Sequence, residues 1–190
     1  MRRYIYFVFL LCCAVNLLLT SCVRQKYVVM DMVHHNPGEA MTESKFLDPS
    51  FLKKNEYGAK VFFLFEAAQF GIDWKSFDPS LFPATTEAGR WVAEKAEIIH
   101  KKYDAAKKED LQVYCMLDML VLPSLLVEKH RTELTNEQGK LDISKPYTQL
   151  CIRELMKEMF ETFPQLDGLV IRTGETYLHD APYYVGNHPV

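Results

Sequence analysis

The stretch Leu166-Asp167-Gly168-Leu169-Val170-Ile171-Arg172-Thr173-Gly174-Glu175-Thr176 decides the fold that the sequence predicts. It is a short apolar run that is entered through Asp-Gly and left through arginine, glycine and glutamate. A run of this length, rich in branched apolar residues and preceded by a helical pattern, is typical of a strand buried on both faces. Its polar residues gather at the C-terminal end, and parallel sheets build their ligand sites at that end of their strands.

Two earlier stretches repeat this arrangement. Val61–Phe65 is an apolar run that ends at Glu66, and Leu111–Leu117 is a second one that ends at Asp118. We therefore predict three parallel strands, each of which closes on a charged residue. Because parallel strands present their C-terminal ends at one edge, we expect Glu66, Asp118 and Glu175 to share a rim.

Two amphipathic helices separate the three predicted strands. The first begins at Thr86, which is a favourable capping residue, and the second begins after Ser144 and ends before Pro164. Apolar residues recur in both at spacings of four, three and four, which gives each helix one core face. These residues are Val92, Ala96, Ile99 and Tyr103 in the first helix, and Ile152, Met156, Met159 and Phe163 in the second.

The connections between these elements are unequal in length. Residues 67–85 and 119–143 connect a strand to a helix and are long, whereas the connections from helix to strand are short. Right-handed crossovers place all strand-to-helix connections on one side of a parallel sheet. In a (β/α) barrel that side is the working face and the other is structural. The long aromatic and acidic segments therefore mark the predicted working face.

The N-terminus predicts secretion. Arg2 and Arg3 precede a nearly unbroken apolar run, Tyr4–Leu19. This run is shorter than the roughly 20 residues of a membrane-spanning helix but suits a secretory signal peptide. We expect residues 1–21 to be this signal, with a tether and an irregular lead-in over residues 22–58.

The end of this signal, Leu19-Thr20-Ser21-Cys22, resembles the bacterial lipoprotein signal. The resemblance implies that Cys22 is lipidated and becomes the first mature residue, so that the chain is held at a membrane. In that family an aspartate after the cysteine usually marks retention in the inner membrane. The residue here is Val23, so we expect an outer-membrane lipoprotein facing the periplasm or the cell surface. A plain signal peptide that is cut nearby is the alternative.

Composition excludes several classes of function. With 48% hydrophobic and 25% charged residues the chain has the make-up of a globular protein, and its net charge of −3 without a basic patch argues against nucleic acid as a partner. Neither glycine-rich phosphate-binding fingerprint follows a predicted strand, which disfavours a nucleotide binder. Cys115 and Cys151 are best interpreted as small buried hydrophobes, and no Cys/His spacing resembles a zinc site. We therefore expect no cofactor and no metal.

The number of predicted strands is small for a barrel. A (β/α)8 barrel takes about 250 residues, and this sequence supplies fewer than three units. We therefore expect a piece of a larger barrel protein, whose missing C-terminal portion is its partner; an open three-layer α/β sheet is the alternative. An exposed apolar parallel edge promotes aggregation, so residues 23–190 alone are expected to be aggregated or molten.

Three short segments look like bacterial barrel-type glycoside hydrolases. They are Leu141-Asp142-Ile143-Ser144-Lys145-Pro146-Tyr147, the helix end Phe163-Pro164, and Leu166-Asp167-Gly168-Leu169. In those enzymes a D-x-[ST]-x-P segment begins a helix, and an [FY]-P-x-[LVY]-D-G-[LIV] junction leads into the next strand. The resemblance implies an α/β fold, a partial (β/α)8 TIM-type barrel over residues 59–190, and a carbohydrate substrate or ligand.

Glycoside cleavage uses two carboxyl groups, one on each side of the scissile bond. The catalytic candidates are Glu66, Asp118 and Glu175. The substrate-binding candidates, which follow the strands on the same side, are Trp74, Arg172, Tyr177, His179, Asp180, Tyr183, Asn187 and His188. Glu66 and Asp118 could instead be salt-bridge partners at the rim, Arg172 could pair with Glu175, and the aromatic residues could be loop packing.

The resemblance also limits what this chain can do. In similar hydrolases the acid/base residue commonly lies on a later strand, so we expect an incomplete catalytic set here. The leading hypothesis is an outer-membrane-tethered, carbohydrate-active protein of the glycoside hydrolase kind. The competing hypothesis is a non-catalytic surface lipoprotein that binds a glycan or a partner through the same loops.

Overall fold

A computed structural model describes residues 29–31, 45–63, 66–172, 176, 178 and 181–187. The predicted signal peptide, Cys22 and most of the tether lie outside the described residues. In the described part of the chain, no helix combines the length and the apolar character needed to cross a membrane.

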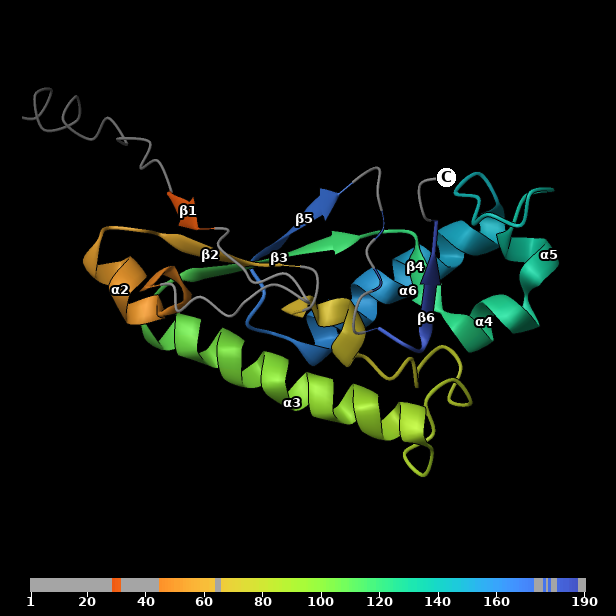
Figure 1. Cartoon of the computed structure of the whole chain (residues 1–190), viewed down its shortest axis with the longest axis horizontal. Coiled ribbons are helices and arrows are strands. Elements are labelled where there is room, and N and C mark those ends of the chain that lie inside the picture. Colours follow the sequence, from red (N-terminus) through yellow and green to blue (C-terminus); the bar gives the residue numbers. More distant parts are fainter. Residues whose placement is uncertain are drawn as a thin grey trace, which may run out of the picture.

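The centre of the fold is a four-stranded sheet (Figure 1). Its strands are β1 (Met30–Asp31), β2 (Ala59–Phe62), β3 (Gln112–Asp118) and β5 (Gly168–Arg172), in that spatial order. Every neighbouring pair is parallel. The prediction of three parallel strands is therefore confirmed, with β1 added at the edge next to β2.

The strand order supports the α/β class and the partial (β/α)8 barrel. The parallel strands follow one another in space in the order of the sequence, as they do in a barrel, whereas a doubly wound sheet reverses its order at a switch point. Long helices occupy the two main crossovers, one between β2 and β3 and one before β5. This is the arrangement of consecutive β/α units.

The two long helices form where the apolar spacing predicts them. α3 spans Glu87–Lys108, and the side chain of Thr86 caps it by accepting a hydrogen bond from the Gly89 backbone N–H at 3.0 Å. α6 spans Pro146–Thr162 and has its proline in the first turn, where a missing N–H costs no helical hydrogen bond. The buried face of α3 includes Val92, Ile99 and Tyr103.

A short 3₁₀ helix, η3 (Ala68–Gly71), lies between these two helices and packs against both. Gly71 permits this close packing, because a Cβ atom there would lie 2.6 Å from the Phe163 ring and 2.9 Å from the Cα of Ala96. The segment after β2 thus fills the helix layer, and α3 runs along one side of the sheet in Figure 1.

The lead-in to β2 is more ordered than the sequence predicts. Residues 45–47 form the 3₁₀ helix η1, and α2 spans Pro49–Lys54. Asp48 caps α2 by accepting a hydrogen bond from the Ser50 backbone N–H at 2.9 Å. The element is short, so its apolar residues show no sustained period; Leu52 is the one that is fully buried.

Residues 119–143 also contain more structure than the predicted connection. They form β4 (Val121–Pro123), α4 (Ser124–Lys129) and α5 (Arg131–Leu134). β4 pairs antiparallel with β6 (Tyr184–Gly186), so the segment after β5 contains a strand that the sequence analysis did not predict. Figure 1 shows this second sheet beyond the end to which the β3 and β5 arrows point.

The prediction that the last parallel strand is buried on both faces is wrong for the described residues. β5 lies at the edge of the sheet, its residues are mostly half-buried, and Ile171 is 49% exposed. An apolar run indicates that a segment forms a strand. It does not indicate whether that strand is covered on both faces. The opposite edge is similar, because Met30 of β1 is 46% exposed.

Candidate functional site

Asp118 and Arg172 meet at the C-terminal ends of two neighbouring strands. They are the last residues of β3 and β5 and are direct register partners. Side chains paired in register point to the same face of a sheet, so the geometry of the two strands brings these two together. The Arg172 guanidinium donates from Nε to Asp118 Oδ1 at 2.7 Å and from Nη2 to Oδ2 at 2.9 Å.

This ion pair is buried on its acidic side. The Asp118 side chain is 2% exposed and that of Arg172 is 22% exposed. A buried carboxylate must be compensated, and a bidentate guanidinium does this with two charge-assisted hydrogen bonds in a fixed plane. Asp118 therefore holds the guanidinium in one orientation at the rim. Both carboxylate oxygens of Asp118 are engaged by this guanidinium.

Glu66 is directed elsewhere. Its carboxylate pairs with Lys102 of α3, and its backbone carbonyl accepts a hydrogen bond from the Tyr103 hydroxyl at 2.9 Å. The structure thus places Glu66 against the helix layer, as a salt-bridge partner. Of the three predicted catalytic carboxylates, two are described, and they take different partners on different elements.

Trp74 lies in the core and not on a binding surface. Its side chain is 0% exposed, and its ring packs edge-to-face against Phe77 with centroids 6.0 Å apart. The backbone of Trp74 has φ of 56°, in the left-handed region, which turns the chain inward there. A ring without an exposed face cannot stack on a sugar, so this residue serves loop packing.

Tyr183 and Asn187 both lie in the segment after β5. Tyr183 is half-buried and packs edge-to-face on Trp91 at 5.8 Å. Burial, aided by the nearby Glu87 carboxylate, raises the pKa of the Tyr183 hydroxyl. The Asn187 side-chain amide bonds to the Leu141 backbone in the way that a neighbouring strand would. It accepts a hydrogen bond from the Leu141 N–H and donates one to the Leu141 carbonyl, both at 2.8 Å. Asn187 is thereby committed to structure.

The remaining predicted site residues lie outside the described residues and stay predictions. They are Cys22, Glu175, Tyr177, His179, Asp180 and His188.

Cysteines and metal ligands can be assessed for the described part of the chain. Cys115 and Cys151 are free and buried, as predicted, and burial raises the pKa of each thiol to about 11. Within the described ranges, no group of three or more His, Cys, Asp or Glu side chains is arranged to hold a metal ion.

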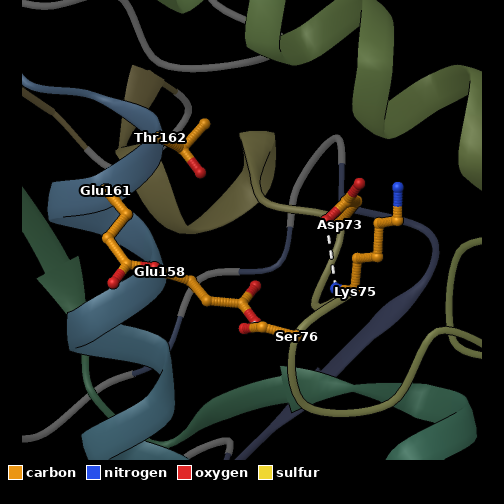
Figure 2. A pocket seen from close by; sticks show the side chains of 6 residues that line it. All are labelled: Asp73, Lys75, Ser76, Glu158, Glu161 and Thr162. Carbon is orange, nitrogen blue, oxygen red and sulfur yellow. Dashed lines mark hydrogen bonds between the residues drawn. The ribbon is translucent and has the colours of Figure 1, made fainter.

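The sequence analysis missed one polar cluster. An open pocket of about 440 Å³ lies between α6 and the segment after η3 (Figure 2). Its most buried member is Glu158, 5% exposed, which follows Leu155 by three residues and Cys151 by seven and so lies on the buried face of α6. This spacing, which places a glutamate on the buried face of a helix, was the sequence signal that could have revealed the cluster. The lining residues are Asp73, Lys75, Ser76, Glu158, Glu161 and Thr162.

A comparison with solved structures finds the crystal structure of a noncanonic maltogenic alpha-amylase AmyB from Thermotoga neapolitana. The two chains share 15% sequence identity, the match covers 80% of this chain and 40% of that one, and the TM-score is 0.47. The chain thus spans less than half the length of that enzyme. No protein-family model and no curated protein matches the chain.

Proposed function

We propose that this chain belongs to a carbohydrate-active protein of the barrel-type glycoside hydrolase kind, held at the outer membrane through a lipid on Cys22. The observation that carries the proposal is the Asp118–Arg172 pair at the C-terminal rim of a parallel sheet. That rim is where enzymes of this architecture build their sites. The Asp142–Pro146 and Phe163–Gly168 segments, which resemble those hydrolases, begin α6 and lead into β5.

The rim pair suits recognition of a sugar better than bond cleavage. A buried carboxylate fixes the plane and the position of the guanidinium before a ligand arrives, and a preorganised positive charge suits hydroxyl or carboxylate oxygens. Asp118 is buried and bidentate, so we assign it the positioning of Arg172. Glu175, three residues after Arg172, remains the candidate for a reacting carboxyl group.

A non-catalytic glycan-binding lipoprotein is the second candidate. The observation that favours it is that both described candidate carboxylates are engaged in ion pairs, Asp118 with Arg172 at the rim and Glu66 with Lys102 of α3. An acid or a nucleophile needs a carboxyl group that can reach the glycosidic bond.

The test uses the full chain solubilised from membranes in detergent and a panel of neutral and acidic oligosaccharides. Binding is measured by calorimetry, and cleavage by the release of new reducing ends. Asp118→Asn is compared with Asp167→Asn, which removes an aspartate charge at the other end of the same strands. Losing the charge that fixes Arg172 should weaken binding about tenfold or more, and the control should stay within about twofold.

Each outcome has a defined meaning. Binding with release supports a hydrolase, and binding without release supports the second candidate. No binding by any member of the panel, or equal losses in both variants, contradicts a carbohydrate site at this rim. The anchor is tested separately by metabolic labelling with a radioactive fatty acid, which wild type should incorporate and Cys22→Ala should not.

A further inference from the structure

Glu158 connects two parts of the helix layer that are far apart in the sequence. Its carboxylate accepts a hydrogen bond from the Ser76 hydroxyl, 82 residues earlier in the chain. Figure 2 shows the Glu158 side chain reaching from α6 to Ser76, across the open pocket. The residue is 5% exposed, so a charge on this carboxylate is largely withdrawn from water.

The Ser76 side of the contact is a tight turn, residues 72–78. The backbone N–H groups of Phe77 and Asp78 both donate to the Trp74 carbonyl, at 3.0 and 2.8 Å. The flanking rings are packed, with Trp74 fully buried and Phe77 tilted against Tyr147 of α6 at 6.2 Å. Ser76 is therefore the polar point at which this turn is fastened to α6.

The charges that face Glu158 are mostly of its own sign. Asp73 comes from the turn and Glu161 from α6, while Lys75 from the turn supplies one positive charge. The Asp73 carboxylate accepts from the Lys75 backbone N–H at 3.0 Å, which keeps it beside the pocket (Figure 2). On the inner side lies the buried Tyr184 hydroxyl of β6, whose pKa is raised by burial and further by the Glu158 charge.

Glu154, one turn before Glu158 on α6, pairs at 3.7 Å with Lys157, which directly precedes Glu158. Their charges offset each other locally. The pocket side of Glu158 therefore carries two further acids against one base.

We propose that Glu158 and Ser76 form a pH-responsive clasp, which holds the 72–78 turn against α6 firmly when Glu158 is protonated and loosens it when Glu158 is ionised. Protonation converts a buried charge among acids into a neutral group that still hydrogen-bonds to the serine hydroxyl. The pocket gives protons and water a direct route to the carboxyl group.

The direction of the pKa shift of Glu158 supports this. Burial raises the pKa of Glu158 above its ordinary value of 4.5, and the Asp73 charge adds to the rise; the Ser76 hydroxyl and the backbone N–H groups of Ser76 and Phe77 act in the opposite direction and only partly offset it. A folded-state pKa above the unfolded one contributes stability that is fully present below the unfolded pKa and is lost as the pH rises through the folded pKa. The clasp is thus strongest below about pH 4.5 and weakens above it.

The test measures hydrogen exchange of the Phe77 and Asp78 amides in the full chain, comparing wild type with Glu158→Gln at each pH so that intrinsic exchange cancels. Glutamine keeps the size and the hydrogen bond but carries no charge. At about pH 7.5 wild type should exchange faster, by up to about tenfold for each unit by which the pKa is raised, and at about pH 4 the two should be equal.

Two further variants make the result decisive. Glu161→Gln, which neutralises an acid on the rim of the same pocket, should keep most of the pH dependence. Ser76→Ala, which removes the donor, should move the transition to higher pH. A ratio of wild-type to Glu158→Gln exchange that is the same at both pH values overturns the clasp, as does a loss of the pH dependence in Glu161→Gln.

Discussion

The two ends of the β3–β5 pair each carry one aspartate, but the two do different work. At the N-terminal end, Asp167 accepts hydrogen bonds from the Val113 backbone N–H at 2.6 Å and from Lys107 at 2.5 Å. The side chain of Asp167 is 32% exposed and that of Lys107 is 35% exposed. At the C-terminal end, Asp118 is 2% exposed and is held by Arg172. Asp167 therefore binds a backbone N–H as well as an exposed lysine, whereas the buried Asp118 holds an arginine side chain.

The difference shows that the two aspartates contribute to stability in different ways. An exposed ion pair adds about 0–1 kcal/mol, and Asp167 is useful mainly because it satisfies a backbone donor. A buried ion pair adds little net stability, since the desolvation of its charges offsets their attraction. The modest net stability of such a pair is in keeping with the proposed role of Asp118 in positioning Arg172 at the C-terminal rim.

The largest expected effect is that of Asp118→Ala. Removing one partner of a buried pair should lower the free energy of unfolding by about 3–5 kcal/mol, measured by urea denaturation of the full chain in detergent. The double variant Asp118→Leu with Arg172→Met should return close to wild-type stability while sugar binding stays lost. A double variant as unstable as the single one would show that the pair is needed for folding.

The second effect, at the opposite end, is smaller. Asp167→Ala leaves the buried Val113 N–H without its side-chain acceptor and should cost about 1–3 kcal/mol in the same measurement. Asp167→Asn keeps an acceptor oxygen and loses only an exposed ion pair, so it should cost less than about 1 kcal/mol. Equal costs would mean that the charge, and not the acceptor, holds this end.

Gly168→Ala should have a third, moderate effect. A Cβ at Gly168 would lie 2.7 Å from Tyr114 Cε1 and 2.9 Å from Cδ1, and the half-buried ring can move aside at a cost of about 1 kcal/mol. The control is the same substitution in a Tyr114→Ala background, where the overlap is gone. If Gly168→Ala costs as much there, the glycine serves the backbone and not the tyrosine.

The smallest expected effect concerns salt. In double-mutant cycles, the coupling energy between Lys107 and Asp167 should fall by about 0.5 kcal/mol when the salt concentration is raised to about 1 M, because exposed charges are screened. The coupling between Asp118 and Arg172 should change less. The same sensitivity in both pairs would remove the distinction between a buried and an exposed pair.

Much of the sheet could be predicted, because local sequence contains its signal. The apolar runs ending at Asp118 and Arg172 mark strand ends, and the 4-3-4 spacing marks α3 and α6. The partnership of Asp118 with Arg172 was not predicted, because the register between two strands is a tertiary property. The sequence had suggested Glu175 as a partner for Arg172 from proximity in the chain alone.

Other site residues show the same limit. The sequence predicted that the strand over 61–65 closes directly on Glu66, but β2 ends at Phe62, and nothing near Glu66 in the sequence indicates that Lys102 takes its carboxylate. Trp74 is of the residue type that stacks on sugar rings, and the sequence did not show that its ring is buried in the core. The pairing of Asn187 with Leu141 depends on two segments that are 46 residues apart.

The sequence by itself determined the three main parallel strands and the two long helices, their order, and the charged residues that end β3 and β5. These follow from interactions between near neighbours, which periodicity and capping residues record directly. Only the tertiary structure decided which charges meet, that β4 pairs with β6, and that Glu158 faces Ser76. Those contacts join residues dozens of positions apart. They depend on which side chains become buried, and burial is a property of the folded chain as a whole.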